Sequence, residues 1–348
     1  MMKKNILQVG INLGGWISQY PAYEHRHFQS FIIKDDITRI ADWGFDHVRL
    51  PIDYPVLEND ENPGQYLEQG FSYIDNCVHW CEENGLNIII DLHKAPGYAF
   101  DDLGKASLFN DIRMQQRLIN IWQAIASRYG EKPNRIALEL LNEITLSSSD
   151  PWNALYPKLI DTIRPLAPQS LIIIGGNQYN AADQMQYLQI LDDDNILYTF
   201  HHYSPLVVTH YHAPWLNFTE EYRHMISYPG QGKAPEPGFM DRYPQWNYSD
   251  EFSDEVYFDK VYQAEKILPA LDFSRKINQP VYCGEFGVID VAPLQNRLNW
   301  TRDFIELLIE SKVGRALWSY KALDFGLVDG DGKVVSEELV KIAAMTEE

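Results

Sequence analysis

The chain has 348 residues, of which 45% are hydrophobic, so it can bury a large core and does not have the composition of a disordered protein. Its 49 acidic and 29 basic side chains give a net charge of −20, which disfavours binding to nucleic acid or to anionic membranes. An uncharged partner suits this chain better, and its 13% aromatic content offers flat rings on which such a partner could stack.

The N-terminus only faintly resembles a signal peptide. Lys3 and Lys4 precede a short apolar run, but a sustained hydrophobic segment and a small-residue cleavage site are missing. We therefore expect a cytoplasmic protein, while secretion stays open because a removed or unconventional signal would leave the same sequence. No run of 18 apolar residues predicts a membrane span. The three cysteines, Cys77, Cys81 and Cys283, show no disulfide framework.

Eight apolar runs rich in Val, Ile and Leu alternate along the chain with eight helical patterns. The predicted strands are residues 7–13, 47–52, 87–92, 136–141, 171–175, 196–201, 280–285 and 315–319. The predicted helices are residues 34–43, 71–83, 112–128, 152–166, 181–191, 257–276, 294–310 and 336–346. Runs that are apolar on both faces are typical of a parallel sheet covered on both sides. Eight units over the full length favour an α/β fold of the (β/α)8 barrel type over a doubly wound open sheet.

Residues 204–258 do not follow this period. The segment is rich in Pro, Tyr, Trp, His and Asn and shows neither a strand nor a helix pattern. A loop of this length is either functional or disordered, and its many aromatic residues argue against disorder. We predict an ordered, aromatic-rich insertion after the sixth strand that covers part of the active face.

Polar and aromatic side chains follow the predicted strands, where the functional residues of such a barrel gather. Glu143 follows the fourth strand and Glu285 ends the seventh, so both point into one barrel mouth. Either residue alone would be interpreted as a solvated charge. Together they suit glycoside hydrolysis, which needs one protonated and one ionised carboxyl. Like charge holds one pKa of such a pair up and so separates the two roles.

Several motifs resemble glycoside hydrolase family 5 over nearly the full length of the chain, and most closely its single-domain bacterial endo-β-1,4-glucanases. The matching segments are residues 10–16 (GINLGGW), 45–51 (FDHVRLP), 95–97 (APG) after His93, and 282–287 (YCGEFG). The resemblance implies that residues 1–348 form one catalytic domain, with Glu143 as the acid/base and Glu285 as the nucleophile. It also implies a set of supporting residues, namely Arg49, His93, Asn142, His201, Tyr203 and Trp318.

Each supporting residue has a chemical role that suits the reaction. Arg49 and Tyr203 can hold the nucleophile ionised and oriented. Asn142 can donate to the sugar 2-hydroxyl, and the two histidines can bond sugar hydroxyls or carboxylates. Trp318 offers a stacking face, and in the resembling family the peptide bond after this Trp is often cis. We predict two further stacking platforms along the cleft, Trp16 and Trp215.

Two positions depart from the family pattern. Resembling enzymes usually have Pro after the acid/base and often His after the residue that matches His93, whereas this chain has Ile144 and Lys94. Neither change removes a catalytic group. Lys94 places a positive charge near the sugar sites on the non-reducing side, which bears on substrate preference.

We therefore predict retaining endo-hydrolysis of β-1,4-glucosidic bonds in cellulose-type or mixed-linkage β-glucans, with the carboxyls about 5 to 5.5 Å apart. A β-mannanase, a glucomannanase or another β-glycanase is the alternative, because loops rather than motifs set the subsites. A non-catalytic carbohydrate-binding barrel would be expected to lose one Glu of the pair. A phosphate-binding barrel would need a Gly-rich phosphate loop and a catalytic Lys. We expect a monomer that uses no metal and no cofactor.

Overall fold

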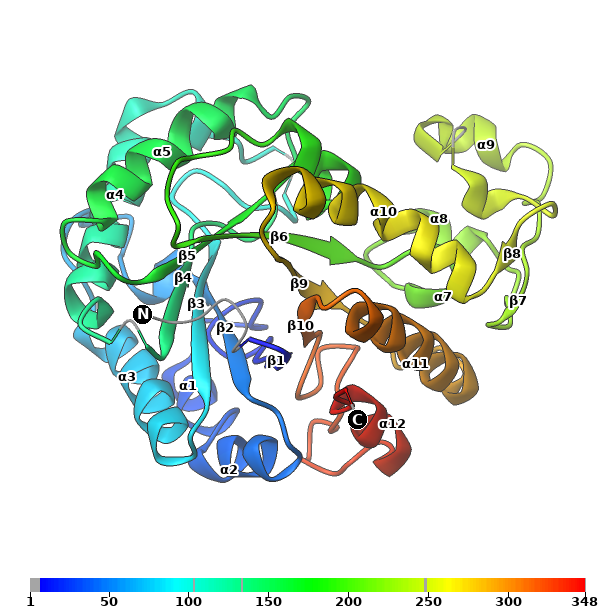
Figure 1. Cartoon of the computed structure of the whole chain (residues 1–348), viewed down its shortest axis with the longest axis horizontal. Coiled ribbons are helices and arrows are strands. Elements are labelled where there is room, and N and C mark those ends of the chain that lie inside the picture. The colour runs from blue at the N-terminus through cyan, green and yellow to red at the C-terminus, as the bar shows by residue number, and fades with distance from the viewer. Residues whose placement is uncertain (1–6, 103, 133, 247–248, 348) are drawn as a thin grey trace.

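The computed structural model describes residues 7–102, 104–132, 134–246 and 249–347, so Lys3 and Lys4 lie outside the described part. Eight parallel strands close into a barrel in the order β1-β10-β9-β6-β5-β4-β3-β2 (Figure 1). The barrel strands are β1 (Val9–Asn12), β2 (His47–Asp53), β3 (Asn87–Lys94), β4 (Ile136–Glu139), β5 (Leu171–Gly175), β6 (Ile196–His202), β9 (Val281–Phe286) and β10 (Gly314–Leu317). The predicted closed barrel is confirmed.

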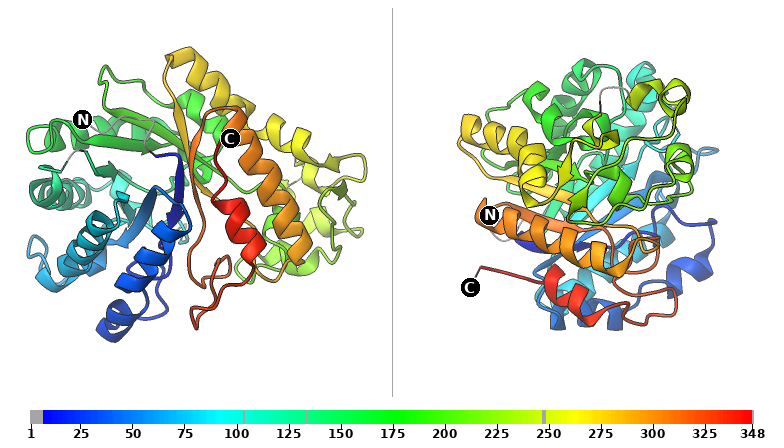
Figure 2. Two further views of the ribbon diagram at one scale, coloured as in Figure 1. Left: turned by 60° about the horizontal axis from the view of Figure 1, so that its bottom comes forward. Right: turned by 90° about the vertical axis from the view of Figure 1, so that its right-hand side faces the viewer.

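Helices surround this barrel (Figures 1 and 2). They are α1 (His25–Ser30), α2 (Lys34–Asp42), α3 (Glu68–Glu83), α4 (Ile112–Tyr129), α5 (Asp150–Ile163), α10 (Lys260–Ile277), α11 (Leu294–Glu310) and α12 (Glu337–Ala343). Helix α2 begins where the Asp36 side chain accepts from the Ile33 N–H, 3.0 Å away, and it stops before Gly44, whose φ is +93°. Within the described ranges, none of the helices has the length and apolar character needed to cross a bilayer.

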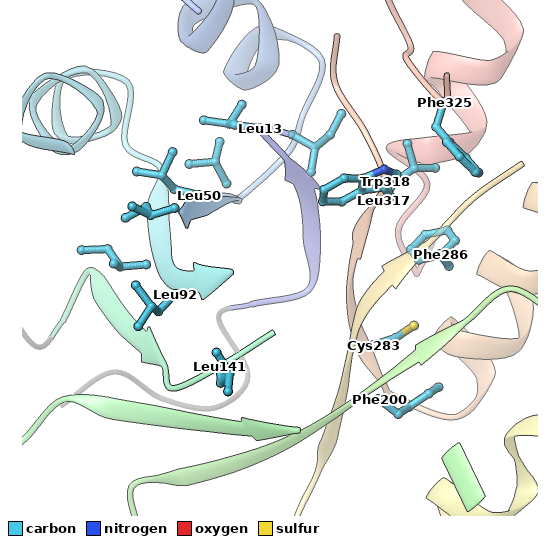
Figure 3. Packing of buried hydrophobic residues seen from close by; sticks show 14 of the residues in the cluster. Leu13, Leu50, Leu92, Leu141, Phe200, Cys283, Phe286, Leu317, Trp318 and Phe325 are labelled. Carbon is cyan, nitrogen blue, oxygen red and sulfur yellow. The ribbon is translucent and has the colours of Figure 1, made fainter. Parts of the chain in front are cut away.

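Two apolar clusters hold the barrel together. The inner cluster lies inside the barrel, on the side of the N-terminal strand ends. It consists of eight buried side chains: Leu7, Ile89, Ala137, Leu171, Ile173, Leu197, Tyr282 and Ala316. The outer cluster lies between the strands and the helices and includes Leu50, Leu92 and Phe200 (Figure 3). Along β3, residues two apart share the inner face, so Ile89 is followed there by Asp91 and His93. The barrel interior therefore changes from apolar to polar towards the C-terminal strand ends.

The helix predicted for residues 181–191 is wrong. The chain instead forms a turn, α6 (Asn177–Asn180), and a 3-10 helix, η4 (Ala182–Tyr187). The pattern was misleading because Ala182, Met185 and Leu188 are buried at a spacing of three, which a 3-10 helix satisfies as well as an α-helix does. The Asn180 side chain accepts from the Gly176 N–H at 2.7 Å, a local bond that competes with helix formation.

In its described residues the insertion is ordered, as predicted, and most of its elements lie to the side of the barrel and not over the active face. Its elements are α7 (Leu206–Thr209), α8 (Asn217–Glu221), β7 (Gly230–Gln231), α9 (Phe239–Arg242) and β8 (Tyr257–Phe258), which lie beside α10 and α11 (Figures 1 and 2). Tyr228 donates to Asp303 at 3.0 Å, and Asn296 donates to the Ile226 carbonyl at 2.7 Å, so the segment is anchored to α11. The start of the insertion reaches the mouth, because His210 contacts Tyr203 and Trp215 contacts Phe325.

Candidate active site

Arg49 on β2 is buried at the centre of the mouth, and all five of its N–H groups donate hydrogen bonds. Two go to the Glu139 carboxylate, and one each to Asn12, Asn142 and Glu285, at distances of 2.7 to 2.9 Å. A guanidinium stays charged in proteins, and a planar group with every donor occupied has one orientation only. Arg49 is therefore a fixed cation that joins strands from both halves of the barrel.

Two further buried carboxyls lie beside Arg49. Asp91 is 3.1 Å from the guanidinium and 2.6 Å from His93 Nδ1. Burial raises the pKa of Asp91 and of Glu139 to about 7 each, against the opposing effect of Arg49. No role was predicted for Asn12, Asp91 or Glu139. Their signal was a polar residue within an otherwise apolar strand, since such residues are seldom buried without a partner.

Glu285 at the end of β9 has two donors. Its Oε1 accepts from Arg49 at 2.8 Å, and its Oε2 accepts from the Tyr203 hydroxyl at 3.1 Å. Burial raises the pKa of Glu285, and Arg49 counteracts that rise. The two donors bond the ionised form, so Glu285 is held in place as a carboxylate.

Glu143 follows β4 and has a different environment. Its Oε1 lies 2.8 Å from His201 Nδ1. Burial and the nearby Glu285 raise the pKa of Glu143 well above its ordinary value. Burial also lowers the pKa of His201 far below its usual range, so His201 is neutral and brings no positive charge to Glu143. Glu143 is thus the member of the pair that keeps its proton.

The two carboxyls lie close together. One oxygen of Glu143, one oxygen of Glu285 and a ring nitrogen of His201 all lie within 4.8 Å of one another. This agrees with the closer, retaining spacing of about 5 to 5.5 Å and not with the roughly 6.5 to 9.5 Å that admits a water molecule for inversion. The same three groups have the spacing of a metal site, but the Arg49 cation already occupies Glu285 and would repel a metal ion. We interpret Glu143 and Glu285 as a catalytic pair of carboxyls and His201 as a neutral neighbour of Glu143.

His93 and Trp318 form one wall of the mouth. Their rings are parallel within 3° with centroids 5.6 Å apart, and the Trp318–Ser319 peptide bond is cis, as the resemblance implies. Burial lowers the pKa of His93 to about 4, so its neutral ring donates to Asp91 and turns Nε2 towards Asn142. A Cβ on Gly14 would lie 2.8 Å from the indole, and one on Gly287 would lie 2.4 Å from the Trp318 carbonyl oxygen. Trp318 therefore requires glycine at both positions.

The prediction of Trp16 as a stacking platform is wrong. Trp16 is buried, donates to the Phe28 carbonyl at 2.7 Å and stacks on Trp80. It therefore packs in the core against α1 and α3 and does not face the cleft. Trp215 is half exposed, and its ring lies against Phe325, which in turn contacts Tyr203. It lies at the rim on the Glu285 side, and its role as a stacking platform stays a prediction.

A cavity of about 540 Å³ opens at Lys94, the residue after His93, and lies within the size range of ligand pockets. Its lining includes Asp53 and Lys94, which end β2 and β3, and Tyr98 and Asp101 from the loop after β3. Lys94 is 2.6 Å from Asp101 and 4.0 Å from Asp53. The Tyr98 hydroxyl donates to the Glu143 carbonyl at 2.7 Å, so the wall of this cavity is attached to the acid/base segment.

Comparison with known proteins places this site in a family. Residues 11–324 match the model of cellulase, glycosyl hydrolase family 5. The chain belongs to glycosyl hydrolase family 5. It is 43% identical over 337 residues to Endoglucanase C of Acetivibrio thermocellus, covering 97% of this chain and 98% of that protein. It is 37% identical over 302 residues to Cellodextrinase A of Ruminococcus flavefaciens, covering 86% of this chain and 81% of that protein.

Solved structures agree on the fold. Thermotoga maritima Cel5A in complex with cellobiose superposes with a TM-score of 0.77 at 24% identity, over 97% of each chain. In this family 5 chain, the structure places both residues that depart from the family's sequence motifs, Ile144 and Lys94. Ile144 is buried, and its carbonyl accepts from the Tyr179 N–H at 3.0 Å. Lys94 lines the cavity beside the site.

Proposed function

We propose that this chain hydrolyses internal β-1,4-glucosidic bonds of β-glucans and retains the configuration at the anomeric carbon. The supporting observation is the close Glu143–Glu285 pair, in which only Glu285 contacts a fixed cation. The family, together with a 43% identical relative named endoglucanase, supports the substrate class. Asn142 and His93 lie where they could bond the sugar hydroxyls.

The first step forms a glycosyl–enzyme ester. Glu143 gives its proton to the oxygen between the two sugars, and the bond from the anomeric carbon to that oxygen breaks. A carboxylate oxygen of Glu285 bonds to the same carbon from the opposite face. Arg49 and Tyr203 keep Glu285 ionised and aimed, because both donate to its oxygens.

The second step releases the sugar. Glu143, now a carboxylate, takes a proton from water while the water oxygen bonds to the anomeric carbon. The ester bond to Glu285 breaks and its electron pair returns to the carboxylate. Two inversions give net retention, so the first product carries the β configuration.

The test uses barley β-glucan, lichenan, carboxymethyl cellulose, xyloglucan and glucomannan, with viscosity and reducing ends followed together. An endo-acting enzyme lowers viscosity faster than it releases reducing ends. Proton NMR of the earliest product is expected to show the β-anomer, and an α-anomer would refute the retaining step. Faster hydrolysis of glucomannan than of every glucan would instead favour the mannanase alternative.

We also keep the expectation of a monomer that acts without metal or cofactor. Light scattering gives the oligomeric state. Activity after dialysis against EDTA is expected to equal that of the untreated enzyme, because Arg49 already supplies the positive charge beside Glu285. Loss of activity on chelation, restored by one metal ion, would mean that the carboxyl pair holds that ion.

A further inference from the structure

Asp91 is a buried carboxyl that takes no part in the two covalent steps. It lies on β3 with its side chain fully buried, and its Oδ1 accepts no hydrogen bond within the described part of the chain. A buried carboxyl oxygen without a partner costs stability, so its place in the mouth calls for a role there. The other oxygen, Oδ2, lies 2.6 Å from His93 Nδ1. The contact with the His93 ring is therefore what this carboxyl provides.

The position of the hydrogen on the His93 ring follows from this contact. Asp91 Oδ2 also faces the Arg49 guanidinium at 3.1 Å, so a proton on that oxygen would lie against a positive charge. A proton bound by Asp91 would sit on Oδ1, and Oδ2 is an acceptor in both charge states. The neutral His93 ring must then carry its hydrogen on Nδ1, which leaves Nε2 as an acceptor.

Asn142 lies on the acceptor side of this ring. Its Oδ1 accepts from Arg49 at 2.7 Å, which directs its Nδ2 to His93 Nε2, 3.4 Å away. If the His93 hydrogen were on Nε2 instead, two donors would face each other at this contact. Turning the amide over would then set Nδ2 against the guanidinium, which is also a donor. The amide of Asn142 therefore has one orientation.

These residues form a closed ring on one side of the mouth. The donors all point the same way round it, in the order Arg49, Asn142, His93 and Asp91, and Asp91 faces the Arg49 charge again. Trp318 stacks on His93 with the two ring planes within 3°, which restrains the tilt of the imidazole. Within the described residues, Asn142 Nδ2 has His93 as its one acceptor, so its second N–H is left for a ligand.

We propose that Asp91 is a positioning residue which, through the His93 ring, turns one N–H of Asn142 to the 2-hydroxyl of the sugar at the cleaved bond. The inference rests on the proposed function, because a bond to that hydroxyl strengthens in the transition state of glycoside hydrolysis. Asp91 acts through two other side chains and contributes only to the orientation of this donor. Its removal should therefore cost the enzyme the contribution of the 2-hydroxyl and leave the rest of the reaction in place.

The experiment removes the 2-hydroxyl from the substrate and the carboxyl from the enzyme, singly and together. The substrates are dinitrophenyl β-cellobioside and its 2-deoxy analogue, which lacks the 2-hydroxyl on the sugar at the cleaved bond. Asp91→Ala removes the acceptor of the His93 hydrogen. Asp91→Asn keeps an acceptor oxygen there, because its NH2 group would otherwise face the guanidinium. Glu139→Gln is the matched control, since this buried carboxyl bonds Arg49 alone within the described residues.

For Asp91→Ala we expect kcat/KM on the cellobioside to fall about tenfold, as for one lost hydrogen bond, and kcat/KM on the 2-deoxy analogue to stay within about twofold of the wild type. Asp91→Asn should lie closer to the wild type on the cellobioside, and Glu139→Gln should change both substrates by the same factor. Circular dichroism and thermal melting check the fold of each variant. An equal loss on both substrates for Asp91→Ala would show a general role beside Arg49, and no loss on the cellobioside would show no role; both results overturn the proposal.

The hydrogen on the His93 ring can be tested in the wild-type enzyme. Heteronuclear NMR spectra of protein with isotope-labelled histidine report which ring nitrogen carries the hydrogen, and the signal that is lost in His93→Phe identifies this ring. We expect the hydrogen on Nδ1, and a hydrogen on Nε2 would refute the proposal even if no variant of Asp91 folded. The two failures can be told apart, because a wild-type enzyme that cleaves neither substrate refutes the proposed function, whereas the NMR spectrum tests the ring of side chains without any reaction.

Discussion

Glu285 and Glu143 are the same residue type in the same barrel mouth, and the regions around them differ in the charge of the groups that contact each carboxyl. Both side chains are buried, with 5% and 7% of their surface exposed. Glu285 contacts the Arg49 guanidinium and the Tyr203 hydroxyl, whereas Glu143 contacts a neutral His201. Within the described ranges, no Lys or Arg is in ion-pair contact with Glu143. A fixed cation, and not burial, therefore separates the ionised carboxylate from the protonated acid.

The largest effect is expected for Glu285→Gln. The variant keeps the side-chain volume but cannot form the ester, so turnover should fall by roughly 10⁴-fold or more on every substrate. Turnover is measured on cellotetraose and on dinitrophenyl β-cellobioside, with circular dichroism and thermal melting as the control for folding. Turnover within about tenfold of the wild type would end the assignment of Glu285 as the nucleophile.

For Glu143→Gln the loss should depend on the leaving group. Cellotetraose needs a proton on its departing oxygen, and kcat/KM should fall roughly 10² to 10⁴-fold. Dinitrophenolate leaves without a proton, so kcat/KM on dinitrophenyl β-cellobioside should change little, although kcat falls because the second step lacks its base. Equal losses in kcat/KM on the two substrates would contradict the acid role.

The pH dependence should reflect the same contrast. Because the pKa of Glu143 is raised, its acid form survives to higher pH, and kcat/KM is lost as the pH rises through that pKa. At the acidic end, kcat/KM is lost as the pH falls through the pKa of Glu285. A pH profile of Glu143→Gln on dinitrophenyl β-cellobioside should lack the alkaline limb and keep the acidic one. Persistence of the alkaline limb would assign it to another group.

A smaller effect is expected for Glu139→Gln. Because burial raises the pKa of Glu139 to about 7, its carboxyl is largely protonated at the acidic limb, and the change removes little charge there. The acidic limb of the pH profile should stay in place, while kcat falls less than about tenfold because Arg49 loses one of the two acceptors at this position. Asp91→Asn is the matched comparison, because the pKa of this second buried carboxyl beside Arg49 is also about 7. An acidic limb that moves to lower pH in either variant would show that the carboxyl is ionised there and acts on Glu285.

The smallest effect on activity is expected for Trp16→Phe. Trp16 packs in the core, so the variant should lose about 1 to 3 kcal/mol of unfolding free energy and keep its KM. Trp215→Ala should do the opposite, with unchanged stability and a higher KM for long glucans, because its ring is half exposed at the rim. Urea unfolding and chain-length series measure the two quantities. A raised KM in Trp16→Phe with full stability would restore Trp16 to the cleft.

The fold was predictable because the eight strands are apolar on both faces, and only a covered parallel sheet accounts for that pattern. Glu143 and Glu285 were predictable because each follows or ends such a strand. The contact of Arg49 with Glu285 was predicted, but its other partners were not, since Glu139 alone gives no sign of which cation it meets. Trp16 was misjudged because it follows Gly15, whose φ of +79° redirects the chain, and no sequence pattern shows on which side of that turn the ring lies.

The hydrogen bonds of Arg49 divide unequally between the two halves of the barrel. Four of the five go to residues on β1, on β4 or just after β4, and the fifth crosses to Glu285 on β9. The first half of the chain thus contains the cation with nearly all of its partners, and the second half contributes the reactive carboxylate. Glu285 meets its counterion only where the two halves of the closed barrel pack together, so turnover requires both halves to be in place at once.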